Sequence, residues 1–233
     1  ILIVGGTGFI GHHLAIRALR LNYKVYCISK YKNKKKIKKI IYIQQNLNNK
    51  KKLFKAINHI RFNYVIYASG YIQHELFNKQ GFDYINENII NFNNLISSLN
   101  LKSIRKFINL ASSDEYGLAK APQKEKITQL PLTPYSLIKR YNSALLKTLN
   151  LEFDLNYINI YTFLIYGPGQ KTDRLIPLMI TNFLNNKSFF LKSPKFIRDF
   201  LFIDDYTDLI TILMESKKII NIDINAGSGK KVY

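Results

Sequence analysis

Short apolar runs alternate along the chain with longer stretches whose apolar residues recur at helical spacing. The runs predict strands at 1–4, 24–28, 40–44, 63–68, 104–110, 154–161 and 219–224. The stretches between them predict helices at 9–21, 48–60, 79–99, 134–150, 174–186 and 204–216. Because strands that alternate with helices form βαβ units, we expect an α/β fold built on a doubly wound parallel sheet. Ligands of such sheets bind at the carboxyl ends of the strands.

A turn that contains Gly5, Gly8 and Gly11 joins the first predicted strand to the first predicted helix. Glycine lets the backbone turn tightly and approach a ligand closely. The helix points its free N–H groups and the positive end of its dipole at the turn, which favours a pyrophosphate there. We therefore predict a dinucleotide site of the Rossmann kind, with a purely structural turn as the alternative. The predicted contacts are Gly5, Thr7, Gly8, Phe9, Ile10 and Gly11.

The second predicted strand ends in Ser29-Lys30, where dinucleotide-binding proteins usually carry an acid that binds the ribose hydroxyls. A hydroxyl followed by a cation suits a 2′-phosphate, so we predict NADP in preference to NAD. In the alternative, Lys30 only begins a solvated loop. A cofactor could also approach the ends of the third and fourth strands, where Asn46 could accept a hydrogen bond from the adenine amino group. The residues there are Asn46, Leu47, Ala68, Ser69 and Gly70.

The alternation of strands and helices loosens after Tyr166, where Gly167-Pro168-Gly169 and Ser193-Pro194 interrupt it. We expect residues 1–165 to form an NAD(P)-binding Rossmann domain. Residues 166–233 are expected to form part of a small, irregular substrate lobe with elements that return to the sheet. The chain begins inside a predicted strand and ends in a loop, so we also expect it to be truncated.

Tyr135 and Lys139 lie one helical turn apart in the predicted helix 134–150, after a Thr133-Pro134 start signal. A lysine near a phenol stabilises the phenolate and lowers the pKa of the tyrosine. Such a pair is a general acid and base for interconverting a carbonyl and an alcohol. Other tyrosines precede lysine at this spacing, but they fall in a predicted strand or in loops. A serine at the end of the preceding strand could share the proton, and we expect that strand end to adjoin the glycine turn.

Six segments occur in a characteristic order: Gly5 to Gly11, Asn88, Ser112 to Gly117, Tyr135 with Lys139, Tyr166 to Gln170, and Arg198-Asp199-Phe200 with Asp204-Asp205. With them the chain resembles the extended short-chain dehydrogenase/reductase family, in its NAD-dependent epimerase/dehydratase group that acts on nucleotide sugars. The resemblance implies a Rossmann fold, a nicotinamide cofactor, a nucleoside-diphosphate sugar as substrate and a homodimer.

The resemblance also assigns roles to single residues. It implies that Tyr135 is the base, that Lys139 holds the cofactor ribose, and that Asn88 supports the site. It implies that Arg198 binds the diphosphate of the substrate, where a bidentate contact between arginine and phosphate is physically reasonable. We place Tyr166 and Arg174 with Arg198 among the substrate-binding residues.

The sequence is compatible with two reactions. An epimerase or a 4-keto reductase, acting by hydride transfer at the hexose C4, needs Tyr135 and a serine, and is preferred. A nucleotide-sugar 4,6-dehydratase needs a further base and acid, which Asp114 and Glu115 could supply; otherwise these two are polar loop residues. The family's serine stands four residues before the tyrosine of its Tyr-Gly pair, which favours Ser112 over Ser113.

The formal net charge of +20 suggests a polyanionic partner. It motivates a second class of function, a non-catalytic dinucleotide sensor or an RNA-binding protein on the same fold. Because the lysines are scattered and aromatic residues do not interleave with their runs, we expect no nucleic-acid partner.

The rest of the composition indicates where in the cell the protein is located. The single cysteine, Cys27, excludes an intrachain disulfide and suggests a reducing compartment. No apolar run approaches the ~18 residues that a membrane span needs. We therefore expect a cytoplasmic protein with no membrane partner. The four histidines show no metal-ligand spacing, so we expect no metal site.

Overall fold

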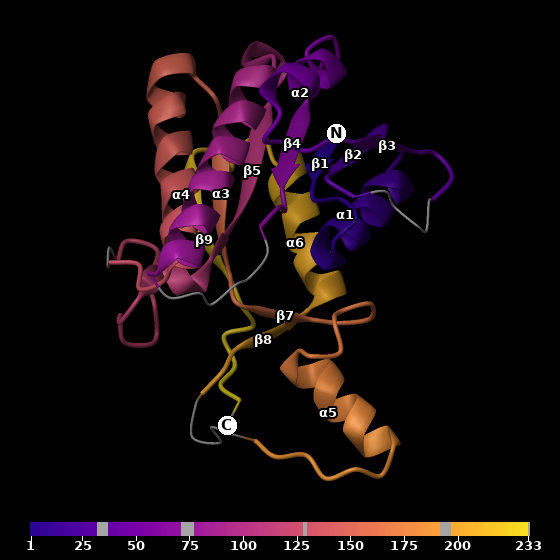
Figure 1. Cartoon of the computed structure of the whole chain (residues 1–233), viewed down its shortest axis with the longest axis vertical. Coiled ribbons are helices and arrows are strands. Elements are labelled where there is room, and N and C mark those ends of the chain that lie inside the picture. The colour runs from indigo at the N-terminus through magenta and orange to yellow at the C-terminus, as the bar shows by residue number, and fades with distance from the viewer. Residues whose placement is uncertain (32–36, 71–76, 128–129, 192–196, 233) are drawn as a thin grey trace.

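The computed structural model describes residues 1–31, 37–70, 77–127, 130–191 and 197–232. Within them, the centre is a sheet of seven parallel strands in the order β3-β2-β1-β4-β5-β6-β9 (Figure 1). The strands are β1 (Leu2–Val4), β2 (Val25–Ser29), β3 (Ile40–Gln44), β4 (Tyr64–Tyr67), β5 (Lys106–Ser112), β6 (Tyr157–Thr162) and β9 (Ile222–Ala226). The chain winds outward from β1 in both directions, which confirms the prediction of a doubly wound parallel sheet.

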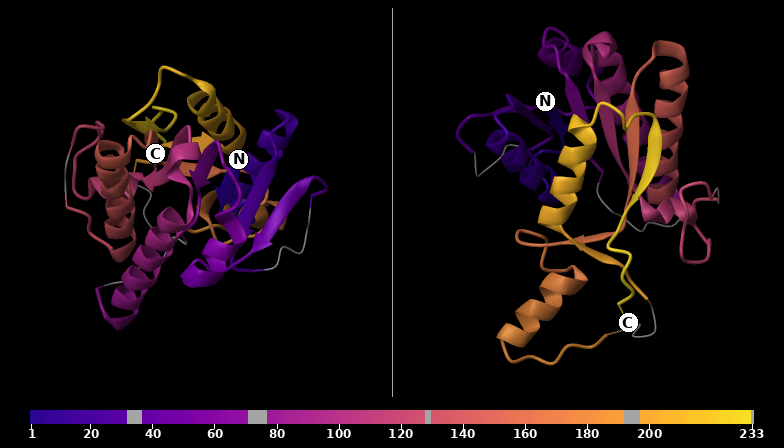
Figure 2. Two further views of the ribbon diagram at one scale, coloured as in Figure 1. Left: turned by 90° about the horizontal axis from the view of Figure 1, so that it is seen from above. Right: turned by 180° about the vertical axis from the view of Figure 1, so that it is seen from behind.

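Helices cover both faces of the sheet and make three layers (Figure 1 and Figure 2). One face carries α1 (Phe9–Arg20) and α6 (Ile203–Glu215), and the other carries α2 (Lys50–Ile57), α3 (Lys79–Ser98) and α4 (Pro134–Phe153). Successive strand residues point to opposite faces. In β1, Ile3 therefore joins the apolar core of α1 and α6, whereas Leu2 and Val4 join the core of α2, α3 and α4. These two cores fix the register of the strands.

A smaller lobe lies beyond the carboxyl ends of the strands (Figure 1). It holds a two-stranded parallel sheet of β7 (Leu164–Tyr166) and β8 (Phe200–Phe202), and the helix α5 (Leu175–Leu184). The sequence pattern missed β7 and β8, because three residues are too few to show an alternation. All residues of α5 are described, and none of them is buried. By contrast, α6 packs against α1, and β9 pairs with β6 in the large sheet.

Two details of the strands differ from the sequence-based expectation. β4 pairs with both β1 and β5, so the end of β5 does not adjoin the glycine turn directly, and that expectation is wrong. The last strand begins at Ile222, because Asn221, with a φ of +55°, still belongs to the turn before it. The other predicted strands and helices are confirmed, apart from shifts at their ends.

The helix α4 begins where the sequence predicts. The Thr133 hydroxyl accepts a hydrogen bond from the Ser136 N–H (3.1 Å), and the Ser136 hydroxyl accepts one from the Thr133 N–H (3.0 Å). Pro134 suits the first helical position, because an N–H there would have no partner in the helix. This reciprocal cap fixes the first turn of α4, on which Tyr135 lies.

Leu146 on α4 is fully buried in the core with α2 and α3, and Leu151 on the same helix is 86% exposed. We expect Leu146→Ala to lower the free energy of unfolding by about 2–5 kcal/mol, because it removes buried apolar groups and leaves a cavity. Leu151→Ala should change it by less than about 0.5 kcal/mol. Urea unfolding followed by circular dichroism measures both. Equal effects would contradict the packing of α4 against the sheet.

Candidate functional site

The glycine turn lies between β1 and α1, at the carboxyl edge of the sheet. Gly5 has a φ of +82°, which favours glycine, and its N–H donates to the Ile28 carbonyl oxygen of β2 (2.9 Å). A Cβ on Gly11 would lie 2.3 Å from the Gly5 carbonyl oxygen, so only glycine lets α1 start this close to the turn. Gly8 is the N-cap of α1 but has no side chain to cap it, and the first turn of α1 carries no acid. The first N–H groups of α1 therefore suit an anion.

The residues after β4 lie between the glycine turn and α4. The Ala68 N–H donates to the Val4 carbonyl oxygen (2.9 Å), and a Cβ on Gly5 would lie 2.9 Å from the Ala68 carbonyl oxygen. Gly70 has a φ of +121°, and a Cβ there would lie 3.5 Å from the Lys139 ammonium nitrogen. The residues after β4 that are predicted to bind a cofactor thus adjoin the glycine turn on one side and the predicted catalytic lysine on the other.

Three predicted catalytic residues meet where β5 ends against α4. Tyr135, in the first turn of α4, is 6% exposed, and it lies beside Ser112, the last residue of β5, whose side chain lowers the pKa of the phenol. One turn later, Lys139 donates to the Leu110 carbonyl oxygen (2.7 Å) and to the Ser69 carbonyl oxygen (3.5 Å). Its ammonium nitrogen lies 5.6 Å from the centre of the Tyr135 ring. A phenol, a hydroxyl and an ammonium group therefore share one buried corner, which we call the catalytic corner.

Burial governs the charges of the catalytic corner. It raises the pKa of Tyr135 above its ordinary value, and the nearby Ser112 side chain lowers that pKa only in part. Burial also lowers the pKa of Lys139 to about 8. The expectation that Lys139 brings the pKa of Tyr135 below its ordinary value is therefore wrong, because both groups are withdrawn from water together. The phenol rests in its protonated form.

The turn after β5 is a short 3₁₀ helix, η2 (Ser113–Tyr116). Ser112 caps it: its hydroxyl accepts from the Asp114 N–H (3.2 Å), and its own N–H donates to Oε1 of Glu115 (3.2 Å). Glu115 is 1% exposed, and burial raises its pKa to about 7, whereas Asp114 is exposed. Of the two candidate serines, Ser112 is the one whose side chain affects the pKa of Tyr135. The other, Ser113, begins η2 and is half-buried.

The end of β2 holds the predicted determinant of cofactor choice. The Ser29 hydroxyl donates to the Tyr31 carbonyl oxygen (2.8 Å). The Lys30 ammonium nitrogen lies 3.5 Å from a carboxylate oxygen of Glu87 on α3, and both side chains are about half exposed. Such an exposed ion pair is weak, so Lys30 can exchange this carboxylate for another anion.

The predicted cofactor residues after β3 and on α3 make local contacts. The Asn46 amide oxygen accepts from the backbone N–H two residues later (3.1 Å), which leaves a second lone pair for a ligand. Leu47 is buried, and its carbonyl oxygen accepts from the Asn94 side chain of α3 (2.9 Å). On the same helix, the Asn88 side chain donates to the Tyr84 carbonyl oxygen (2.8 Å).

Tyr166, Arg174 and Arg198, which are predicted to bind the substrate, lie in the small lobe. Tyr166 ends β7, and its ring packs edge-on against Phe202 of β8, with 5.4 Å between the ring centres. Arg174 is the N-cap of α5, and Arg198 forms two backbone hydrogen bonds with Val232 just before β8 (2.9 Å each). The elements that carry or adjoin them, β7, α5 and β8, lie beyond the carboxyl ends of the strands of the large sheet (Figure 1).

Residues 1–227 match the model of the NAD dependent epimerase/dehydratase family. The chain belongs to this family. The membership predicted from the order of the six segments is thereby confirmed, as is the Rossmann-type fold.

The curated relatives include both kinds of enzyme in the family's name. The chain is 28% identical to a dTDP-D-glucose 4,6-dehydratase of Dictyostelium discoideum, over 95% of this chain and 57% of the relative. It is 26% identical to UDP-glucuronate 4-epimerase 1 of Arabidopsis thaliana, over 88% of this chain and 52% of the relative. The chain thus spans little more than half the length of these relatives, and family membership leaves the reaction open.

Solved structures of the family share the fold. A UDP-glucose 4-epimerase from Thermotoga maritima, solved with UDP-glucose, superposes with a TM-score of 0.88 at 20% identity, and 99% of this chain and 77% of that chain are covered. A UDP-glucuronic acid 4-epimerase from Bacillus cereus, solved with UDP-glucuronic acid and NAD, has a TM-score of 0.82 at 24% identity, with 99% and 78% covered. At these identities the likeness establishes the architecture alone.

Behind the catalytic corner of this epimerase/dehydratase family member lie two asparagines that the sequence pattern passed over. Asn109 of β5 and Asn159 of β6 are fully buried and hydrogen-bonded to each other (3.0 Å). Asn159 also donates to Asp223 of β9 (3.0 Å). An asparagine inside an apolar strand is the signal that could have identified them, since a buried amide needs partners. They tie three neighbouring strands together beneath α4.

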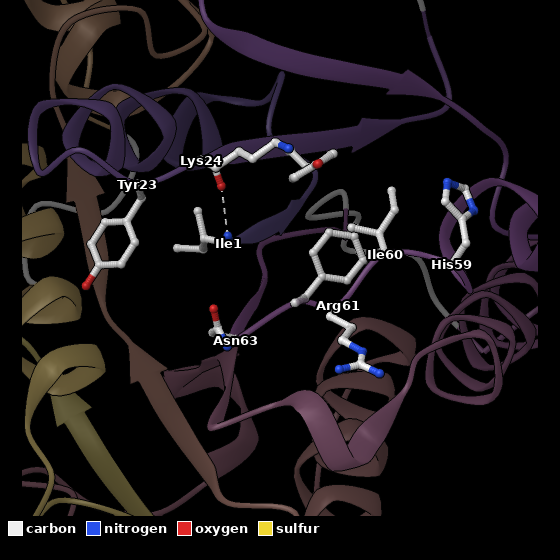
Figure 3. A pocket seen from close by; sticks show the side chains of 9 residues that line it. Ile1, Tyr23, Lys24, His59, Ile60, Arg61 and Asn63 are labelled. Atoms are coloured by element: carbon white, nitrogen blue, oxygen red, sulfur yellow. Dashed lines mark hydrogen bonds between the residues drawn. The ribbon is translucent and has the colours of Figure 1, made fainter.

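A cavity of about 640 Å³ lies at the opposite end of the strands, near the amino ends of β1 and β2 (Figure 3). Tyr23, Lys24 and Phe62 line it, and the amino group of Ile1 donates to the Lys24 carbonyl oxygen (2.9 Å). None of the predicted cofactor or catalytic residues lines this cavity. We therefore place the candidate site at the carboxyl edge, where ligands of doubly wound sheets bind.

Two further features are absent from the described ranges. No group of three or more His, Cys, Asp and Glu side chains there could hold a metal ion. No helix there is both long enough and apolar enough to cross a membrane.

Gly11→Ala tests the close approach of α1 to the glycine turn. We expect the free energy of unfolding to fall by about 1–3 kcal/mol, because the new methyl group pushes the helix away from the Gly5 carbonyl group. The affinity for NAD⁺ should fall with it, since the N–H groups of α1 are displaced. Thermal unfolding and titration calorimetry measure the two effects. Arg20→Ala, at the exposed end of the same helix, is the control, and equal stability of the two variants would contradict the approach.

Proposed function

We propose that the full-length protein acts on a nucleoside-diphosphate sugar by hydride transfer at the hexose C4, as a 4-epimerase or a 4-keto reductase. The observation that carries this proposal is the catalytic corner, where the buried Tyr135 lies beside Ser112 and the Lys139 ammonium group. The relative named UDP-glucuronate 4-epimerase 1, at 26% identity, supports it.

The residues at the carboxyl edge fit a dinucleotide. The turn at Gly5 and Gly11 lets the backbone come close, and the uncapped start of α1 suits a pyrophosphate. When bound, the nicotinamide would supply the acceptor and donor of the hydride. Lys139 would donate to the nicotinamide ribose from its place between the Ser69 and Leu110 carbonyl groups.

In this proposal Tyr135 moves the proton of the C4 hydroxyl. Its buried, protonated phenol is ready to protonate the C4 oxygen when a keto sugar is reduced. In the reverse direction the phenolate takes the proton of the C4 hydroxyl as the hydride leaves C4. Ser112 holds the same oxygen and passes the proton. The protonated resting state of Tyr135 fits the reductive half of either reaction.

The second candidate is a 4,6-dehydratase that uses Asp114 and Glu115, and the dehydratase relative supports it. Burial argues against it, because a base that removes the C5 proton must reach the sugar, and Glu115 is only 1% exposed. We therefore rank it second. A non-catalytic sensor or RNA-binding protein ranks third, because such a role would not require Tyr135, Ser112 and Lys139 to converge.

We also infer how the chain divides into domains, how it assembles and where it is located. Residues 1–165 bind the dinucleotide, and 166–233 contribute the substrate lobe before α6 and β9 return to the sheet. Arg174, Arg198 and Tyr166 contact the substrate, and Asn88 supports the site. We infer a cytoplasmic homodimer from the resemblance and from the single cysteine, Cys27.

Tyr135→Phe tests the role of the phenol. We expect kcat for a UDP-hexose to fall about 10²–10⁴-fold, because the proton of the C4 hydroxyl loses its acceptor and donor. Cofactor affinity should change little. Tyr141→Phe, on the same helix, is the control, since its hydroxyl donates to Asn93 at an exposed site. Mass spectrometry of the product distinguishes epimerisation (no mass change), reduction (gain of two hydrogens) and dehydration (loss of water). Turnover that survives in Tyr135→Phe would refute the mechanism.

Lys30→Asp tests the proposed preference for NADP. We expect NADP⁺ to bind about tenfold more weakly or worse, which corresponds to about 1.4 kcal/mol, because the 2′-phosphate would meet a carboxylate. NAD⁺ should bind at least as well as before. Lys38→Asp makes the same change of charge at an exposed position nearby and is the control. If the ratio of the two affinities is the same in Lys30→Asp and in the wild type, the preference has another origin.

A further inference from the structure

Glu115 is enclosed behind the catalytic corner. Its Oε1 accepts hydrogen bonds from the Ser112 N–H (3.2 Å) and from the Ser143 hydroxyl of α4 (3.4 Å). Its Oε2 is buried and has no hydrogen-bond partner among the described residues. A carboxylate placed in this way costs free energy unless nearby positive charge compensates it.

The compensating charge comes from α4. Ser143, which donates to Glu115, lies one helical turn after Lys139 on the buried face of α4, so the charges of Glu115 and Lys139 are near each other. The positive charges of Lys139 and Arg140 lower the pKa of Glu115, and the negative charge of Glu115 raises the pKa of Lys139. The hydrogen-bond acceptors of Lys139 are the neutral Leu110 and Ser69 carbonyl groups. The negative charge of Glu115 therefore offsets part of the cost of burying the Lys139 ammonium group.

The side chains around Glu115 are themselves held. Ser143, which donates to Glu115, also accepts from the Asn109 side chain (3.4 Å). Asn109 is bonded to Asn159, whose side chain donates to Asp223, and Asp223 pairs with Lys147 at the surface (2.5 Å). This network of hydrogen bonds connects the residues that surround Glu115 to β6 and β9. The carboxylate can leave its place only by breaking buried hydrogen bonds.

We propose that Glu115 is a positioning residue, which holds the Ser112 backbone against Tyr135 and keeps Lys139 protonated from behind the site without touching the substrate. The proposal rests on the proposed function for its meaning in catalysis. Its physical content, the coupling between Glu115 and Lys139, does not depend on which sugar is converted.

The coupling has a definite sign. Burial holds the pKa of Lys139 at about 8 even with Glu115 beside it. Removing the charge of Glu115 lowers that pKa further, so Lys139 loses its proton at a lower pH. A neutral amine cannot form the charge-assisted hydrogen bond to the cofactor ribose. As the pH rises, cofactor binding should therefore begin to weaken at a lower pH than in the wild type. The other titratable groups that interact electrostatically within this cluster are Arg140, Asp114, Glu125, Asp223, Tyr84, Tyr116, Tyr135 and Tyr161.

The experiment compares Glu115→Gln with the wild type in the full-length protein. Glutamine keeps the size of the side chain and an oxygen that accepts from the Ser112 N–H, but it removes the charge. Titration calorimetry with NAD⁺ and with NADP⁺, from pH 6 to pH 10, gives the pH at which binding is half lost. We expect that pH to be lower by about one unit in Glu115→Gln, so that Kd near pH 8 rises several-fold. Glu152→Gln, the same change at an exposed position on α4, should leave the profile unchanged.

Three outcomes decide the matter. A profile of Glu115→Gln that overlaps the wild-type profile overturns the proposal. A shift in Glu115→Gln and none in Glu152→Gln supports it. Unchanged cofactor binding with complete loss of sugar turnover also overturns it, and makes Glu115 a group that acts on the substrate.

A second variant covers the case in which Glu115→Gln does not fold. Ser143→Ala removes one hydrogen bond from the Glu115 carboxylate and raises its pKa, so a smaller shift in the same direction is expected. No shift in Ser143→Ala then overturns the proposal. A wild-type protein that converts no nucleotide sugar would defeat the proposed function, but the cofactor titrations would still decide the role of Glu115.

Discussion

The hydrogen bond from the Lys139 ammonium group to the Leu110 carbonyl oxygen is the interaction on which the candidate site depends. It joins α4 to the end of β5, and the longer contact with Ser69 extends the link to the end of β4. A buried cation is unfavourable without compensation. Two carbonyl groups, the ring of Tyr135 and the charge of Glu115 provide it here. The same groups define the catalytic corner. The contacts that stabilise the buried charge of Lys139 therefore also fix the position of Tyr135.

The sequence predicted the large sheet because its strands are continuous apolar runs, as buried parallel strands usually are. It also selected Tyr135 among several tyrosines that precede a lysine, because the Thr133-Pro134 pair marks the start of a helix. The reciprocal cap between Thr133 and Ser136 is the physical basis of that signal. Local chemistry of this kind can be read from neighbouring residues alone.

Other features could not be predicted from neighbouring residues. The sequence left Glu115 open between a catalytic role and a place in a polar loop, and only the structure shows that the capped turn η2 buries it. The pKa of Tyr135 depends on how completely its side chain is buried, which only the packed structure shows. The short strands β7 and β8 form because they pair with each other across a long separation in the sequence. Each of these depends on tertiary contacts, which a periodic pattern does not contain.

The position of β4 between β1 and β5 has a consequence for the length of the ligand. Neighbouring strands lie about 4.8 Å apart, so the glycine turn after β1 and the serine that ends β5 are separated by two such spacings, or about 10 Å. A small anion bound at the glycine turn could not reach Tyr135. Only an extended molecule, with its phosphates at one end of this gap and its reactive ring at the other, can occupy both places at once. The order of the strands therefore sets the length that a ligand must have, whichever side chains line the site.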